Sequence, residues 1–123
     1  MKIILAIGTG SFLGGVFRYL LSESIQSKYL TAFPIGTMLV NFTGCFFIGL
    51  VYGFAERGVL SGDWKLFLAT GLLGGFTTFS AFSIETVGLM RNGQLGYAAA
   101  YISASVIIGL LATFAGIFLV RIF

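Results

Sequence analysis

The sequence predicts an all-α membrane protein, with four transmembrane helices in one domain that covers residues 1–123. Three observations lead to this fold class. Hydrophobic residues make up 58% of the chain and charged residues only 9%, whereas a soluble domain carries roughly a quarter charged residues. The mean hydropathy is +1.04. Four apolar stretches reach the roughly 20 residues that a helix needs to cross a bilayer.

The flanking residues support each predicted span. In the first span, Arg18 lies near the end, where it could extend to the interface as an anchor or stand in a vestibule and attract anions. Pro34 is well placed to begin the second helix. Trp64 and Lys65 precede the third and are typical interfacial anchors, and the fourth span contains no charge. The predicted spans are about 3–21, 34–55, 66–90 and 95–120.

The third span contains a stretch that is poorly suited to a helix. Between Gly71 and Ser83 it carries three glycines, two threonines and two serines, and no charge. Irregular backbone is tolerated inside a membrane only where protein or a water-filled cavity satisfies its polar groups. Broken helices near the midplane are where transporters bind ions. The sequence therefore predicts a third helix that is broken in mid-membrane, at a site of function.

Composition excludes several classes of protein. The chain has no histidine and one cysteine, Cys45, so it offers no Cys/His metal site and no Ser-His or Cys-His nucleophile pair. Its four acidic residues do not cluster, and we expect no enzymatic activity. The formal charge of +3 is spread singly along the chain, so nothing indicates nucleic-acid binding.

The distribution of basic residues leaves the orientation in the membrane open. With four spans, both termini and the second connection share one side. That side would hold Lys2, Arg57, Lys65 and Arg121, and the other side Arg18, Lys28 and Arg91. The positive-inside rule hardly separates the two orientations. Either the signal is simply weak, or copies insert both ways and pair as inverted dimers. Four helices leave no solvated path along their own axis, so a conduction pathway would need a second subunit.

Polar side chains in three spans are candidates for an ion path. In the second span, Thr37 and Asn41 lie one turn apart and share a face; Asn41 could either bond a neighbouring helix or donate to an ion. Small-residue spacings at Gly10/Gly14, Gly49/Gly53 and Gly71/Gly75 indicate close helix packing. The fourth span has a stripe of period four that runs through Tyr101, Ser105, Gly109 and Thr113.

The third span adds aromatic and acidic candidates. Phe79 and Phe82 follow the glycine- and threonine-rich stretch, with Ser80 beside them. Glu85 lies one turn further on and could act as a proton carrier, a gate or an acid near the interface. Amide and hydroxyl donors suit an anion. Phenyl rings suit an anion at their edges and a cation at their faces, so the residues alone leave the sign of the ion open.

These residues resemble the Fluc (CrcB) fluoride channel family along the whole chain. The first span carries Gly14-x-x-x-Arg18-Tyr19, and the second carries Pro34-x-Gly36-Thr37 leading to Asn41. The third carries a long motif that runs from Gly74-Gly75-x-Thr77-Thr78 through Phe79-Ser80-x-Phe82-Ser83 to Glu85.

The resemblance implies a fluoride-selective channel in the cell inner membrane, which exports cytoplasmic fluoride passively through two pores of an inverted, dual-topology homodimer. Phe79 and Phe82 would turn ring edges toward fluoride, and Asn41 would donate to it. Glu85 would lie beside the pore. Backbone carbonyls of Gly74 and Thr77 from both subunits would hold a structural Na⁺. The polar track would contain Tyr101, Ser105 and Thr113, with Ser80 nearby, and Gly109 departs from members that carry a hydroxyl there.

Two other functions remain as alternatives. A small multidrug-type, proton-coupled exporter would also have four short spans, but it needs an embedded glutamate in its first helix, and residues 3–21 contain none. A non-transporting membrane assembly subunit would explain the glycines and aromatic residues. It would not explain why Asn41, the irregular third span and the stripe in the fourth occur together.

Overall fold

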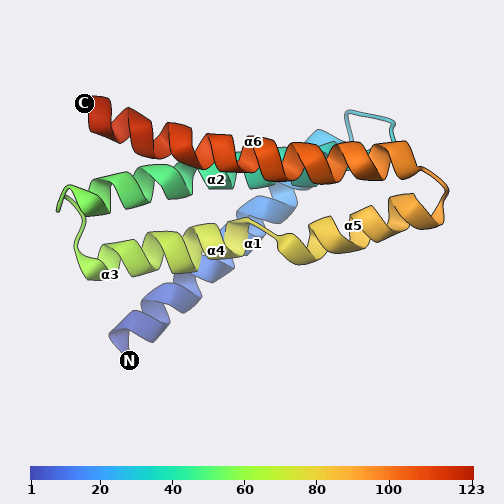
Figure 1. Cartoon of the computed structure of the whole chain (residues 1–123). Coiled ribbons are helices and arrows are strands. Elements are labelled where there is room, and N and C mark those ends of the chain that lie inside the picture. The colour runs from blue at the N-terminus through green and yellow to red at the C-terminus, as the bar shows by residue number, and fades with distance from the viewer.

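The computed structural model describes residues 1–123, and every regular element in it is helical. Four helical segments are long and apolar enough to cross a membrane, as the sequence predicts. They cover Lys2–Gln26, Ile35–Glu56, Gly62–Arg91 and Leu95–Ile122. The first, second and fourth are the single helices α1, α2 and α6, and the third is assembled from consecutive pieces (Figure 1).

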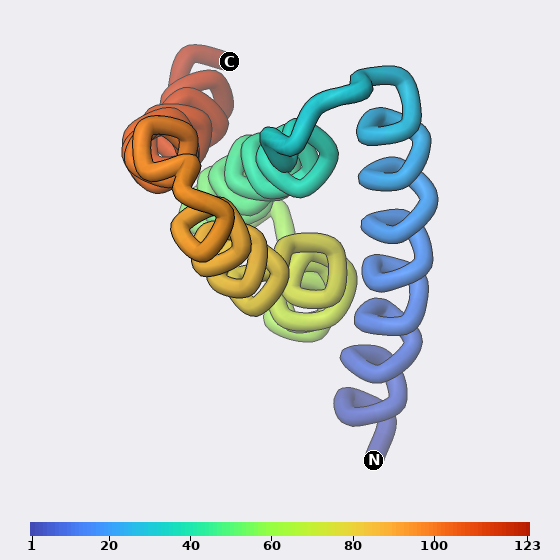
Figure 2. The backbone as a smooth tube through the Cα atoms, turned by 90° about the vertical axis from the view of Figure 1, so that its right-hand side faces the viewer, coloured from blue at the N-terminus to red at the C-terminus, as the bar shows by residue number.

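The first helix, α1 (Lys2–Gln26), crosses the other helices steeply; Figure 2 shows it side-on while the others are viewed nearly end-on. Its glycine spacing explains the contact. Gly10 and Gly14 are buried, and a Cβ on either would collide with the backbone around Leu72. The predicted packing role of this pair is therefore confirmed. The helix continues past the predicted end at Leu21 and so includes Glu23, which is exposed in its last turns.

The helices α2 (Ile35–Glu56) and α6 (Leu95–Ile122) run in parallel and make the most extensive helix contact in the molecule (Figure 1). Glycine again allows the approach: a Cβ on Gly49 would collide with the Thr113 carbonyl, and one on Gly116 with the Phe46 carbonyl. At the shared C-terminal end, an Arg57 Nη atom donates to the Val120 carbonyl over 2.7 Å. A cation at that end also interacts favourably with the helix dipole.

The third segment changes its helix type along its length. It begins with α3 (Gly62–Lys65), where the Ser61 hydroxyl accepts a hydrogen bond from the Trp64 amide over 3.4 Å. A π-helix, η1 (Leu66–Leu73), and a single turn, α4 (Gly74–Phe76), follow. After an interruption, α5 (Phe79–Arg91) completes the segment. Beyond α5, Gly93 has φ +76°, a left-handed conformation that suits glycine and turns the chain into α6.

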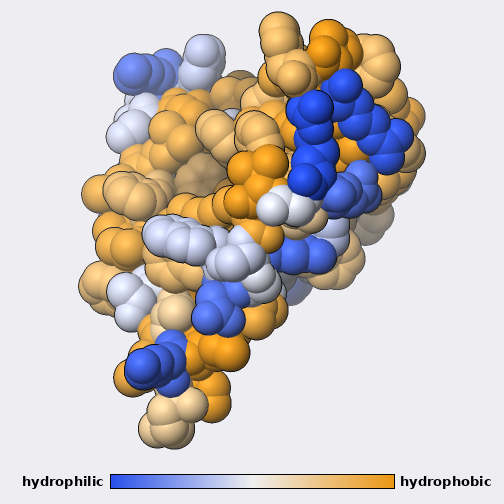
Figure 3. All heavy atoms as spheres, turned by 90° about the vertical axis from the view of Figure 1, so that its left-hand side faces the viewer, coloured by the Kyte–Doolittle hydropathy of each residue, from blue (hydrophilic) through white to orange (hydrophobic).

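The isolated chain buries little of itself. Only 19 of its 123 residues are buried, while large apolar side chains on every long helix are exposed. Figure 3 shows the end of the molecule near the C-terminus, where apolar residues dominate and hydrophilic ones form separate groups. Such a surface is unfavourable in water but suited to lipid or to another subunit. The protein is therefore a multi-pass membrane protein.

Candidate functional site

The interruption of the third segment lies at Thr77 and Thr78, whose backbone is extended (φ −83°, ψ 157° and φ −150°, ψ 116°). Thr77 still bonds backward, because its amide and its hydroxyl both donate to the Leu73 carbonyl, over 2.9 and 3.0 Å. Thr78 bonds forward: its hydroxyl accepts from the Ala81 amide over 3.1 Å and caps α5. The two threonines thus end one helix and begin the next without a proline.

Asn41 of α2 replaces the helical hydrogen bonds that the interruption removes. Its Oδ1 accepts from the Thr78 amide over 2.8 Å, and its Nδ2 donates to the Thr78 carbonyl over 3.1 Å. Of the two expectations for this side chain, the structure contains the bond to a neighbouring helix. A carboxamide nitrogen carries two hydrogens, however, and the bond to Thr78 uses one. The same residue can therefore hold the backbone and still donate to an ion.

Arg18 lies against the third segment, next to the interruption. Its Nε donates to the Gly75 carbonyl over 3.1 Å, and the side chain is partly buried. The sequence left two roles open for Arg18, an interfacial anchor or a charge that attracts anions, and this contact is compatible with the second. Glycine makes the contact possible: a Cβ on Gly75 would collide with the Ser11 carbonyl, so α1 comes close enough for the guanidinium to reach a carbonyl of α4.

A cleft of about 350 Å³ opens beside the interruption, between α2, the third segment and α6. Four residues expected in an ion path line it together: Asn41, Phe79, Phe82 and Ser105. Thr77, Thr78 and Gly74 line it as well. The structure thus brings together residues from three spans that are far apart in the sequence.

The two phenylalanines lie at the mouth of this cleft and differ in exposure. The Phe79 ring is 78% exposed, whereas Phe82 is partly buried. Their ring centroids are 5.5 Å apart and the planes are tilted by 43°. Phe82 also lies against Tyr101, at 5.1 Å between centroids. Most of the Phe79 ring is therefore accessible at the surface of the chain.

Glu85 joins three helices. One carboxylate oxygen accepts from the Thr37 hydroxyl of α2 over 2.6 Å, and the other accepts from the Tyr101 hydroxyl of α6 over 2.7 Å. Thr37 and Tyr101 are both buried. The sequence singled out all three residues but did not predict that they meet. Spacing along one chain gives no signal for a contact between residues 37, 85 and 101.

The predicted stripe on α6 divides among three environments. Tyr101 bonds Glu85, and Ser105 lines the cleft. The Thr113 hydroxyl is instead within hydrogen-bond distance of the carbonyls of Cys45 (3.1 Å) and Gly109 (3.2 Å), at the contact between α2 and α6. On the third segment, the Ser80 hydroxyl is 3.2 Å from that of Thr78.

The backbone carbonyl oxygens at the interruption are the ligands that could bind a cation. In a continuous helix the Thr78 amide would donate to the Gly74 carbonyl, but here it donates to Asn41 Oδ1. Gly74 is exposed on the surface of the chain. The chain has no cluster of His, Cys, Asp or Glu that could bind a metal, but backbone carbonyls suit a hard cation such as Na⁺.

Comparison with known proteins finds a family that matches almost the whole chain. Residues 5–117 match the model of the family described as CrcB-like protein, Camphor Resistance (CrcB). The chain is 44% identical over 122 residues to a protein of Flavobacterium psychrophilum and 45% identical over 122 residues to one of Rhizobium meliloti, with 98% of each chain covered. A relative from Thermus thermophilus is 42% identical over 116 residues, which cover 94% of this chain and 93% of the relative. All three are named fluoride-specific ion channel FluC.

Proposed function

The chain belongs to the CrcB family, and we propose on that basis that it is a fluoride-specific ion channel that spans the membrane several times and catalyses no reaction. The observation that carries the proposal is the cleft at the interrupted third segment, where a carboxamide, a hydroxyl and two phenyl rings meet. Passive export of cytoplasmic fluoride across the cell inner membrane would make cells resistant to it.

The chemistry of the cleft suits a small anion. Asn41 keeps one amide hydrogen free, and Ser105 adds a hydroxyl. The rims of phenyl rings carry partial positive charge, so Phe79 and Phe82 can complete the shell that an ion loses when it leaves water. No lysine or arginine lines the cleft. An anion can therefore enter without being held too tightly to leave.

Residues around the cleft have supporting roles in this proposal. Thr37 and Tyr101 orient the Glu85 carboxylate beside the path, and Ser80 lies next to the cap at Thr78. Arg18 supplies positive charge near the interruption, which raises the local concentration of anions. Thr113, which the family resemblance puts in the polar track, does not line the cleft, and its hydroxyl is bonded at the contact between α2 and α6, so we assign it a packing role.

We propose further that the channel is an inverted homodimer. Phe79 is 78% exposed at the mouth of the cleft, so a second subunit is needed to close a path around an ion. The nearly equal numbers of basic residues on the two sides support insertion in both orientations. Cysteine-accessibility labelling of each connection in intact cells tests this: labelling of every connection from one side only would contradict dual topology.

The carbonyls of Gly74 and Thr77 fit a structural Na⁺ shared between the two subunits. One subunit offers too few oxygens for a cation site, and the exposed position of Gly74 allows its inverted copy to add the rest. A bound Na⁺ would neutralise carbonyl groups that the interruption leaves without amide partners. Fluoride efflux should then fall when N-methylglucamine replaces Na⁺, and equal efflux in both solutions would contradict the site.

Halide efflux from liposomes tests the function itself. Purified protein is reconstituted with internal fluoride or chloride, and external halide is followed with an ion-selective electrode. We expect rapid fluoride efflux and chloride efflux at the level of protein-free liposomes, because chloride is too large for a close-fitting shell of amide and ring-edge donors. Comparable efflux of both halides would refute the proposal, and so would the absence of fluoride efflux.

A further inference from the structure

The side chain of Gln26 makes several of the hydrogen bonds that hold the connection between α1 and α2, and the Thr31 hydroxyl adds another by accepting from the Phe33 amide over 3.2 Å. The Gln26 Nε2 donates to the Thr31 and Phe33 carbonyls, each over 3.2 Å, and its Oε1 accepts from the Gly36 amide over 3.0 Å. The Gly36 amide belongs to the first turn of α2, which has no helical partner for it. The Gln26 amide thus uses both hydrogens and its oxygen to fix the loop and the start of α2.

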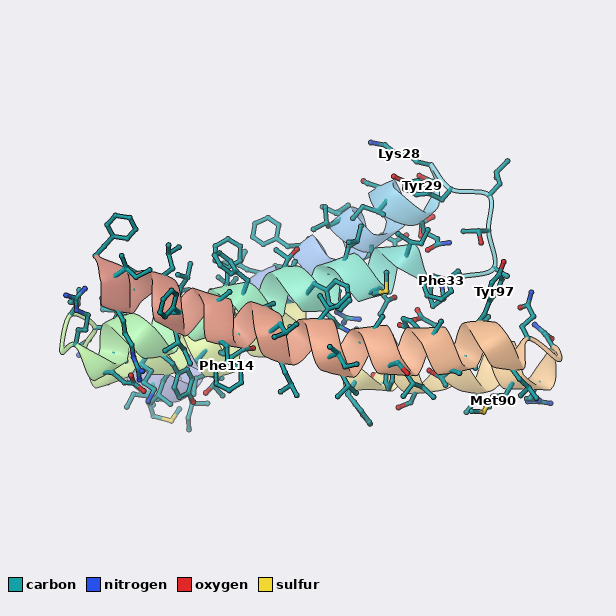
Figure 4. All side chains as sticks on the ribbon, turned by 45° about the horizontal axis from the view of Figure 1, so that its top comes forward. Lys28, Tyr29, Phe33, Met90, Tyr97 and Phe114 are labelled. Carbon is teal, nitrogen blue, oxygen red and sulfur yellow. The ribbon has the colours of Figure 1, made fainter.

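The residue that this arrangement positions is Phe33. Its ring packs edge to face against Tyr97 (centroids 5.8 Å apart, planes at 84°) and against Tyr101 (5.6 Å, 79°). Figure 4 shows Phe33 at the end of the loop, next to Tyr97 of α6. Because Tyr101 also contacts Phe82, which contacts Phe79, a continuous chain of aromatic rings runs from the loop to the mouth of the cleft.

Tyr101 belongs both to this series of aromatic rings and to the hydrogen bond with Glu85. It has no exposed surface, and its hydroxyl donates to Glu85. Its ring lies between Phe33 and Phe82. The direction of the hydroxyl is fixed by what confines the ring, and on the loop side that is Phe33.

We propose that Phe33 is a positioning residue for fluoride conduction, which acts by holding Tyr101 on Glu85, and that Gln26 acts through Phe33. This inference rests on the proposed channel function. It assigns to a connecting loop a part in the ion path, although the loop itself does not line the cleft. A residue that merely fills space in the subunit would affect stability, but its effect on flux would not depend on the Tyr101 hydroxyl.

The first experiment compares fluoride efflux from liposomes for Phe33→Ala and Tyr29→Ala. Tyr29 lies in the same loop, is 51% exposed and forms no aromatic pair, so its replacement is a matched control for loss of a ring. We expect Phe33→Ala to lower efflux about tenfold, because two edge-to-face contacts are lost, and Tyr29→Ala to leave it unchanged. Phe33→Tyr, which keeps the ring, should restore efflux to within about twofold of wild type.

The second experiment is a double-mutant cycle with Tyr101→Phe, which removes the hydroxyl and keeps the ring. If Phe33 acts through that hydroxyl, Phe33→Ala should lower efflux less than about twofold in the Tyr101→Phe background. Gln26→Ala should likewise add little to Phe33→Ala. Independent, multiplicative losses would overturn the inference.

The controls separate this inference from the function on which it rests. Wild-type protein without fluoride efflux would refute the channel itself. A conducting wild type with Phe33→Ala equal to it would refute only the role of Phe33. If Phe33→Ala loses the dimer peak on size exclusion, Phe33→Leu, which keeps most of the volume, replaces it. Wild-type efflux in that variant would overturn the inference, and reduced efflux that depends on the Tyr101 hydroxyl would support it.

Discussion

The two sides of the interruption in the third segment are held in place by different kinds of contact. On the side before Thr77, α4 and η1 pack against α1 through glycine: Gly14 and Gly75 each bring backbone against backbone. On the side after Thr78, α5 is held by polar side chains and aromatic rings, with Asn41 at its start and Glu85 one turn beyond Phe82.

Within this one transmembrane segment, the part before the interruption serves mainly to pack against α1, and the part after it carries the side chains that can contact an ion. Close packing through Gly14 and Gly75 depends on shape, and it supplies no side-chain donor for an anion. Hydrogen bonds from amides and hydroxyls have donors that an ion can share. The side before the interruption should therefore tolerate no added volume, and the side after it should tolerate changes that keep volume but alter conduction.

The largest effect is expected from Gly14→Val, which tests the glycine side. Its Cβ would collide with the Leu72 carbonyl, which is backbone and cannot move aside without displacing η1. We expect loss of the dimer peak on size exclusion, and of fluoride efflux with it. Gly15→Val is the matched control, because a Cβ there meets nothing within 4 Å. Normal assembly of Gly14→Val would contradict the assignment of shape-dependent packing to this side.

Replacing Phe79 and Phe82 together by Ile tests the other side. Both side chains stay apolar and large, so the dimer should persist. Ring edges that stand in for water around the ion are lost, and we expect fluoride efflux to fall to that of empty liposomes. Efflux and size exclusion on the same preparation check both expectations. A variant that still transports fluoride would show that these rings do not conduct it.

Asn41→Asp tests the residue that both holds the Thr78 backbone and lines the cleft. The carboxylate can still accept from the Thr78 amide, but it loses both amide hydrogens and adds negative charge next to the cleft. We expect fluoride efflux to fall about 100-fold, through repulsion of the anion, with the dimer retained. Thr43→Val on the same helix is the control, since that hydroxyl donates only to Leu39 of its own helix. Equal efflux in the two variants would remove Asn41 from the path.

The smallest effect is expected from Thr113→Val. Its hydroxyl is bonded to carbonyls between α2 and α6 rather than facing the cleft, so fluoride efflux should change by less than about threefold. A slightly lower thermal stability is expected from the lost hydrogen bond. If efflux falls as far as in Asn41→Asp, the ion path extends beyond the cleft along α6, as the family resemblance suggests.

Much of the helical framework could be predicted from the sequence, because lipid leaves helices as the main solution for long apolar stretches. The helix ends were less predictable. α1 continues to Gln26, whose side chain bonds the next loop through contacts that its own segment does not reveal, and α3 begins at Gly62 because Ser61 caps it. Nothing in the apolar stretch Leu66–Leu73 distinguishes a π-helix from an α-helix.

The members of the site could be predicted better than their contacts. Asn41 and Glu85 stand out as polar residues in apolar spans, and Phe79 and Phe82 stand out through their place directly after the glycine- and threonine-rich stretch. Which groups they touch depends on how the helices cross, and that is why the bonds of Arg18 to Gly75 and of Glu85 to Tyr101 were not foreseen. Phe33 was missed altogether, since one phenylalanine among fourteen gives no signal without its neighbours.

The double hydrogen bond between Asn41 and Thr78 also bears on how the protein is made. On its own, the third segment has no group that could replace the helical hydrogen bonds lost at the interruption. Inside lipid it would therefore be more stable as a continuous helix. The second segment precedes the third along the chain, so Asn41 is synthesised before the Thr78 backbone that it bonds. The shape of the third segment therefore depends on a residue from a neighbouring segment and is not set by its own sequence alone.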